Sequence, residues 1–144
     1  MSRYLPYDPG QLPTRPSPAP GETMILDLPG LPPNKEVWRS IRNRRHPRHL
    51  TFVVLRKAAA DAMAGRAWYF GPVELRLTVY GSRPLNRWGL NDYLGGVMDT
   101  LDGSSGETFT YLPIIFEDDC QVTKAQATWV KRAENSYRLK IVFK

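Results

Sequence analysis

Residues 73–80 carry the pattern that decides the fold: Val73-Glu74-Leu75-Arg76-Leu77-Thr78-Val79-Tyr80. Apolar and polar side chains alternate strictly along this stretch, which Gly71-Pro72 precedes and Gly81 follows. Successive side chains of a strand point to opposite faces of a sheet, so the alternation predicts a strand with one buried face and one wet face.

Two stretches with helical spacing flank this strand. From Leu50 to Ala64, apolar residues recur at the helical period, and Gly65 is a plausible helix stop. Residues 92–101 predict a second helix, which Asn91 or Asp92 could cap. Each helix has an apolar side that a sheet could cover.

The remaining apolar segments complete the predicted fold. We expect strands at 24–28, 121–131 and 137–143, a short apolar run at 111–116, and a hairpin turn at 134–136. The resulting order, βαβαβββ, predicts an α+β fold with two helices packed on one face of a small mixed sheet. Residues 1–22 hold six of the 13 prolines and are predicted to form a flexible tail, which leaves residues 23–144 as the domain.

Length and composition narrow the class of protein. The 144 residues suit one domain, and a hydrophobic content of 42% excludes a fully disordered chain. The single cysteine, Cys120, excludes an internal disulfide framework and a cysteine-ligated zinc site. No apolar run approaches the roughly 18 residues of a membrane span, and no signal peptide opens the sequence. We therefore expect a cytoplasmic protein without membrane contact.

The basic residues are concentrated in one stretch. Residues 35–57 hold eight basic side chains and one acid, a charge of +7, so the rest of the chain carries −1 of the net +6. Such crowded cations repel one another unless a polyanion neutralises them, and this favours nucleic acid as the partner. The alternative is a solvated basic loop. The candidate DNA-binding residues are Arg39, Arg42, Arg44, Arg45, Arg48 and Lys57.

The acidic residues are concentrated further along the chain. Residues 88–123 contain no Lys or Arg but hold seven of the 14 carboxylates. Carboxylates would repel bound phosphate unless a cation such as Mg²⁺ bridged the two. Asp99 and Asp102 are interpreted as a helix side and a turn. The run Glu117-Asp118-Asp119 is a better candidate for metal binding, although a turn would also explain it.

Three motifs, in this order and spacing, resemble the RusA family of Holliday junction resolvases over roughly residues 24–143. The first is a strand that runs into a proline turn, residues 28–34. The second covers residues 89–103, and the third is Phe116-Glu117-Asp118-Asp119-Cys120-Gln121-Val122. The third motif is the most specific, because an apolar residue, an Asp-Asp pair and Gln-Val recur there in the family.

The second motif departs from the family pattern, which is Asp-x-Asp-Asn followed by a lysine two or three residues later. Gly89 and Asn91 stand at the two aspartate positions, Asp92 stands at the asparagine position, and Gly95 replaces the lysine. Asp119, with its neighbour Asp118, matches the family directly.

The resemblance implies a homodimeric endodeoxyribonuclease of recombination and repair. It would resolve four-way DNA junctions by paired symmetric nicks, with Mg²⁺ as the cofactor or Mn²⁺ in its place. The implied catalytic residues are Asp119, Asp118, Asp92 and Asn91, and of these Asp119, Asn91 and Asp92 would bind the metal. Trp38, Tyr93 and Trp88 are candidates for stacking on junction bases, with the core or an interface as the alternative.

Two other functions fit the same residues. Because Gly89 and Asn91 replace the family aspartates, the chain could bind junctions without cutting them. A basic protein-interaction module is the alternative from another class, with the basic loop contacting an acidic partner. Metal-dependent nicking of DNA junctions would distinguish the nuclease from both of these alternatives.

Overall fold

The computed structural model describes residues 12–36, 39–82, 89–105 and 110–144. Its elements in chain order are β1 (Thr23–Pro29), α1 (His49–Met63), β2 (Val73–Gly81), α2 (Leu90–Leu101), β3 (Ser104–Ser105), β4 (Thr110–Tyr111), the 3₁₀ turn η1 (Asp119–Gln121), β5 (Val122–Lys131) and β6 (Ser136–Phe143).

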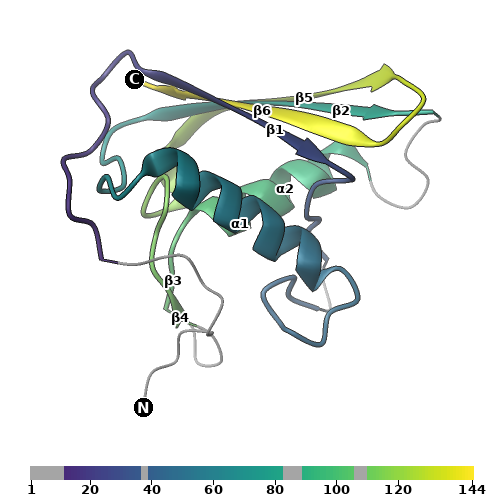
Figure 1. The fold of residues 1–144 in the computed structure, drawn as a ribbon, viewed down its shortest axis with the longest axis horizontal. Helices are drawn as coiled ribbons and strands as arrows, with labels where there is room; N and C mark the ends of the chain where they lie inside the picture. Colours follow the sequence, from purple (N-terminus) through teal and green to yellow (C-terminus); the bar gives the residue numbers. More distant parts are fainter. Residues whose placement is uncertain (1–11, 37–38, 83–88, 106–109) are drawn as a thin grey trace.

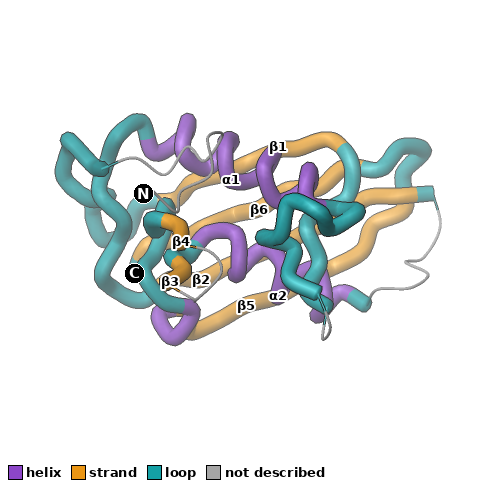
Figure 2. The backbone as a smooth tube through the Cα atoms, turned by 90° about the horizontal axis from the view of Figure 1, so that it is seen from below, coloured by secondary structure: helices purple, strands orange, loops and turns teal. Residues whose placement is uncertain are grey.

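One four-stranded mixed sheet organises the domain, with the strand order β1-β6-β2-β5. β6 runs antiparallel to both β1 and β2, whereas β5 runs parallel to β2. Both helices lie below this sheet in Figure 1, and β1 and β5 form its two edges in Figure 2. The predicted α+β fold, with a small mixed sheet and two helices on one face, is confirmed.

The alternation in β2 sets the core, as the sequence predicts. Its residues at odd positions from 73 to 81 are buried, and those at even positions are partly or fully exposed. The buried side pairs with the buried residues of β6 and packs against both helices, through Leu55 of α1 and Val97 of α2 among others. Burial of each such aliphatic side chain stabilises the fold by about 1.5–3 kcal/mol.

The predicted hairpin at 134–136 is wrong, because β5 and β6 are not neighbours in the sheet. β2 lies between them. The turn therefore crosses the end of β2, where the Arg132 N–H donates to the Gly81 carbonyl at 2.8 Å. The Asn135 carbonyl accepts the Gly30 N–H at 3.0 Å. Turn residues report a change of chain direction, but they do not report which strand pairs with which.

The apolar run at 111–116 forms less strand than its composition suggests. Only Thr110–Tyr111 is a strand here, and it pairs with Ser104–Ser105 in a separate two-stranded sheet. Ile114 and Ile115 are buried in a loop instead, and their N–H groups both donate to the Leu101 carbonyl, at 3.2 and 3.1 Å. The run therefore covers the end of α2 rather than extending the main sheet.

Half of the predicted tail belongs to the packed domain. The Thr14 N–H donates to the Gly65 carbonyl at 2.9 Å, and the Ser17 hydroxyl donates to the Trp68 carbonyl at 2.8 Å. These bonds hold residues 14–17 along the segment that follows α1, and residues 21–22 bond to Phe143 at the end of β6. The proline density does give an extended backbone, but extended backbone can still bond to a neighbouring segment. Residues 1–11 lie outside the described part of the chain.

Neither α1 nor α2 is long and apolar enough to cross a membrane, and no other described segment forms such a helix.

A close contact at Gly96 fixes α2 against the segment that follows β1. A Cβ atom at position 96 would lie 2.2 Å from the Pro33 carbonyl oxygen and 2.6 Å from the Asn34 Cα. Both are backbone atoms, so a methyl group there would force the two segments apart. The Lys35 N–H also donates to the Asp92 carbonyl at 2.9 Å, which ties the same segment to the first turn of the helix.

We predict that Gly96→Ala lowers the free energy of unfolding by about 1–3 kcal/mol, because overpacking outweighs the helix propensity of alanine. Urea denaturation measures this change. Gly89→Ala is the matched control, since a Cβ there meets nothing closer than 3.8 Å. Equal stability of the two variants would contradict the close contact.

Candidate metal centre

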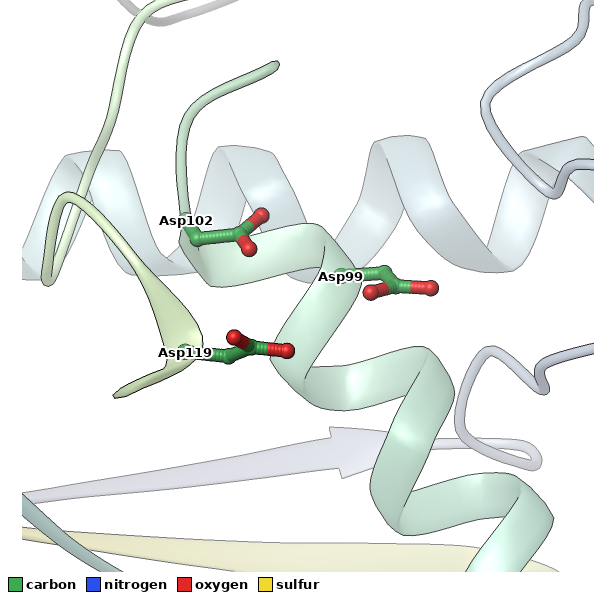
Figure 3. A group of neighbouring side chains, drawn as sticks. All are labelled: Asp99, Asp102 and Asp119. Atoms are coloured by element: carbon green, nitrogen blue, oxygen red, sulfur yellow. The ribbon is translucent and has the colours of Figure 1, made fainter. Parts of the chain in front are cut away.

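Three carboxylates from two separate elements meet at the end of α2. Asp99 lies in the last turn of the helix, and Asp102 immediately follows it. Asp119 opens η1, just before β5. One oxygen from each carboxylate lies within 4.8 Å of the others, and Figure 3 shows the three side chains turned toward the same space. Asp102 is buried, Asp99 is half-buried and Asp119 is exposed.

The residues around Asp119 explain how its side chain is positioned. The Asp118 carboxylate accepts the Cys120 N–H at 2.9 Å and so caps η1. The Gln121 side chain accepts the Glu117 N–H at 2.9 Å and donates to the Tyr69 carbonyl at 2.7 Å. Gln121 thus fastens the turn to the segment before β2. Within the Asp-Asp-x-Gln sequence, Asp118 therefore caps the turn, Asp119 presents an exposed carboxylate and Gln121 anchors the turn to the domain.

The end of α2 is electrostatically unfavourable for carboxylates. A helix carries partial negative charge at its C-terminus, and this helix has no basic residue in its last turn. Two arginines from outside the helix supply the missing positive charge. Arg42 donates to the Asp99 carbonyl oxygen at 2.7 Å and to the Asp102 carboxylate at 2.7 Å. Arg56 donates to the Thr100 carbonyl oxygen at 3.0 Å.

The basic side chains do not fully offset the acids. Burial raises the pKa of Asp99, and Lys35, 3.8 Å from its carboxylate, opposes this shift. Burial also raises the pKa of Asp102 to about 7, with the charges of Asp99 and Asp119 adding to the rise and Arg42 opposing it. The cluster therefore holds more negative charge than its surroundings stabilise, which is a condition that a bound cation would relieve.

The structure brings one of the predicted site residues to this cluster. Asp119 is part of it, whereas Asp118 caps η1 beside it. Asp92 accepts the Gly89 N–H at 2.9 Å and so caps α2 at the opposite end of the helix. Asn91 is exposed in the same first turn. At a rise of about 1.5 Å per residue, both lie on the order of 10 Å along the helix axis from Asp99.

Sequence reasoning passed over Asp99 and Asp102, which it assigned to a helix side and a turn. Those local positions are as expected, since Asp99 lies on α2 and Asp102 follows its end. The available signal was their spacing, because residues three apart lie on the same side of a helix. Asp119 is 17 positions beyond Asp102 in sequence, and only the path of the chain through the β3–β4 pair joins them.

The predicted DNA-binding residues divide into two groups. Arg39, Arg44, Arg45 and Lys57 are exposed, although Arg39 pairs with Glu36 at 2.8 Å and Lys57 pairs with Asp61 at 3.0 Å. Arg42 and Arg48 turn inward instead, and Arg48 donates to the Pro32 carbonyl at 3.4 Å. The exposed group is the part of this stretch that an outside partner could reach.

Only one of the three aromatic candidates, Tyr93, lies within the described residues. Tyr93 is only 2% exposed and belongs to the core. Trp38 and Trp88 lie outside the described residues.

No protein-family model matches this sequence, and the curated proteins contain no chain detectably similar to it.

We predict that the metal-free protein loses stability relative to its Asp102→Asn variant as the pH rises from about 4 to 7. The pKa of Asp102 is 3.8 in the unfolded chain and about 7 in the fold, so the folded state binds more protons in this range. More protons bound to the folded state means that stability falls with rising pH. Urea denaturation with a chelator present should show a fall of a few kcal/mol in wild-type stability relative to that of Asp102→Asn, since one pKa unit corresponds to about 1.4 kcal/mol.

Asp102→Asn should remove most of that slope, because the amide keeps an oxygen for Arg42 but carries no titrating proton. Asp61→Asn, on the exposed side of α1, is the control and should retain it. If stability depends on pH equally in wild type and Asp102→Asn, the fold does not raise the pKa of Asp102.

Proposed function

We propose that this protein is a Mg²⁺-dependent endodeoxyribonuclease that acts on four-way DNA junctions. The observation that carries the proposal is the cluster of Asp99, Asp102 and Asp119, with exposed arginines on the nearby loop that leads to α1. The metal chemistry rests on this cluster. The junction substrate, the paired nicks and the homodimer rest on the sequence motifs that resemble the RusA family.

The donor set suits Mg²⁺, or Mn²⁺ in its place. All three groups are hard carboxylate oxygens, and Mg²⁺ binds through one or two protein carboxylates together with water and substrate phosphate. The graded exposure of the cluster also fits, because Asp119 faces solvent while Asp102 is buried. When bound, the ion would lower the pKa of an attacking water and offset charge on the phosphate.

The surrounding residues would keep this site ordered. Arg42 holds Asp102 by an ion pair that is largely shielded from solvent, and its bond to the Asp99 carbonyl joins that pair to the helix. Asp118 and Gln121 hold the turn that presents Asp119. The exposed arginines would bind the phosphates on either side of the cleaved bond. A two-fold symmetric junction suits an isologous dimer, in which each protomer nicks one strand.

A junction-binding protein without cleavage is the second candidate. Arg42 already pairs with Asp102 at 2.7 Å, which neutralises one carboxylate of the cluster. Gly89 and Asn91 also lack the carboxylates that the family pattern has at their positions. This candidate predicts selective junction binding that does not respond to metal. A basic protein-interaction module predicts no junction binding at all.

We predict that Asp119→Asn lowers junction cleavage by about a hundredfold or more while leaving junction binding intact. Loss of a metal ligand removes several kcal/mol of transition-state stabilisation, and each 1.4 kcal/mol is about tenfold in rate. A gel assay of nicking in Mg²⁺, with binding measured in chelator, separates the two effects.

Asp118→Asn is the matched control for this variant. Asparagine caps a helical turn about as well as aspartate, so the geometry of η1 should survive and cleavage should change far less. An Asp119→Asn protein that cuts at the wild-type rate would contradict the proposed site. A larger loss in Asp118→Asn would transfer the role to that neighbouring acid.

We also predict that Arg44→Ala combined with Arg45→Ala weakens DNA binding and flattens its salt dependence. Each lost phosphate contact on duplex lowers the slope of log affinity against log salt by about 0.9, so the double variant should lose about 1.8. Fluorescence anisotropy at several salt concentrations measures the slope. An unchanged slope would remove these two arginines from the DNA surface.

A further inference from the structure

The face of the sheet that points away from the helices is open across all four strands. No described helix or strand covers it, and in Figure 1 both helices lie on the opposite side. The outward side chains of the three strands other than β1 occupy alternate positions. They are Glu74, Arg76, Thr78 and Tyr80 on β2, Lys124, Gln126, Thr128 and Val130 on β5, and Arg138, Lys140 and Val142 on β6.

The strand register arranges the cations of this face in a diagonal stripe. Lys124 is level with Glu74, Arg76 is level with Lys140, and Arg138 is level with Thr78. From β5 through β2 to β6, each cation lies either directly opposite the previous cation or two residues further along the sheet. The stripe crosses three strands and ends at an open pocket of about 420 Å³, whose lining includes Arg132 and Arg138.

Most of this positive charge has no partner within the described residues. The two carboxylates on the face are already paired, Asp27 with Arg138 at 2.7 Å and Glu74 with Lys144 at 3.3 Å. That leaves Arg76, Lys124 and Lys140 without an ion pair in the part of the chain that the structure describes. Arg76 and Lys140 stand directly opposite each other on neighbouring strands, where like charges destabilise a sheet.

The shape of the stripe indicates the partner. A second copy of this face would bring cations against cations, and Ile25, Val130 and Val142 are too scattered among charges to form an apolar interface. A linear row of cations, interleaved with the hydroxyl and amide groups of Thr78, Thr128 and Gln126, matches the evenly spaced phosphates of a nucleic-acid backbone. An arginine over an aromatic ring closes the row, with Arg132 3.7 Å from the centre of Tyr80.

We propose that the open face of the sheet binds a nucleic-acid backbone along the stripe Lys124-Arg76-Lys140-Arg138. This surface is separate from the acid cluster. The cluster lies on the helix side of the sheet, because Asp99 belongs to α2 and Asp102 immediately follows that helix. Binding at the open face goes beyond the proposed function, since it requires no cleavage. A DNA junction could then contact both sides of the domain.

The test is the salt dependence of DNA binding in chelator, where no cleavage interferes. Fluorescence anisotropy would compare a labelled linear duplex and a four-way junction for wild type and for Arg76→Gln combined with Lys140→Gln. Loss of two phosphate contacts should lower the duplex slope by about 1.8. Removal of the opposed like charges should leave the free protein at least as stable in urea, so weaker binding cannot be attributed to unfolding.

β5 offers a test variant and a matched control variant. Lys124 and Lys131 are both exposed lysines on β5, but the two-residue alternation places them on opposite faces of the sheet. Lys124→Gln should lower the slope by about 0.9, and Lys131→Gln should leave it near the wild-type value.

Each other outcome overturns the proposal. A wild-type slope in the Arg76/Lys140 variant would show that the stripe does not contact phosphate, and equal effects of the two lysine variants would show only non-specific attraction. Binding of polyglutamate but of no nucleic acid would assign the face to an acidic protein. Failure of the proposed nuclease function is distinguishable, because wild-type protein that never nicks DNA could still show the expected loss of slope.

Discussion

The site depends on the hydrogen bonds that two arginines donate to the C-terminal end of α2. Arg42 comes from the loop before α1, and Arg56 lies inside α1, where it is only 1% exposed. Their bonds to the carbonyls of Asp99 and Thr100 satisfy groups that every helix end leaves unpaired. Arg56 also donates to the Leu112 carbonyl, so it joins α1, α2 and the following loop. This attachment positions Asp99 and Asp102, while Asp118 and Gln121 position Asp119.

The same attachment separates the structural cations from the accessible ones. A guanidinium can bind a carbonyl and a carboxylate at once, which suits it to a crowded anionic helix end. Arg42 binds the end of α2 in this way and Arg56 binds two backbone carbonyls, whereas Arg44 and Arg45 face solvent. The basic stretch therefore contains arginines that hold the end of α2 and others that leave their charge exposed to solvent. A count of basic residues in the sequence cannot separate these two roles.

The elements of the fold were predictable where the signal is local. The alternation over residues 73–80 and the helical spacing of the two amphipathic stretches gave the correct elements and the correct side for the core. Strand partners were not predictable in the same way, because β2 enters between β5 and β6 from a distant part of the chain. The site was predictable in part for the same reason. Asp119 lies in a recognisable motif, but its neighbours Asp99 and Asp102 reach it only through the fold.

We propose that the three carboxylates that meet at the end of α2 hold a metal ion and that the protein uses this ion to cut DNA junctions. The most direct test of this proposal is to incubate the protein with a synthetic four-way junction and a matched linear duplex, each with Mg²⁺, with Mn²⁺ and with chelator. We expect paired symmetric nicks in the junction alone, and only when a metal ion is present. Selective junction binding without nicks in either metal, across a range of pH, would contradict it.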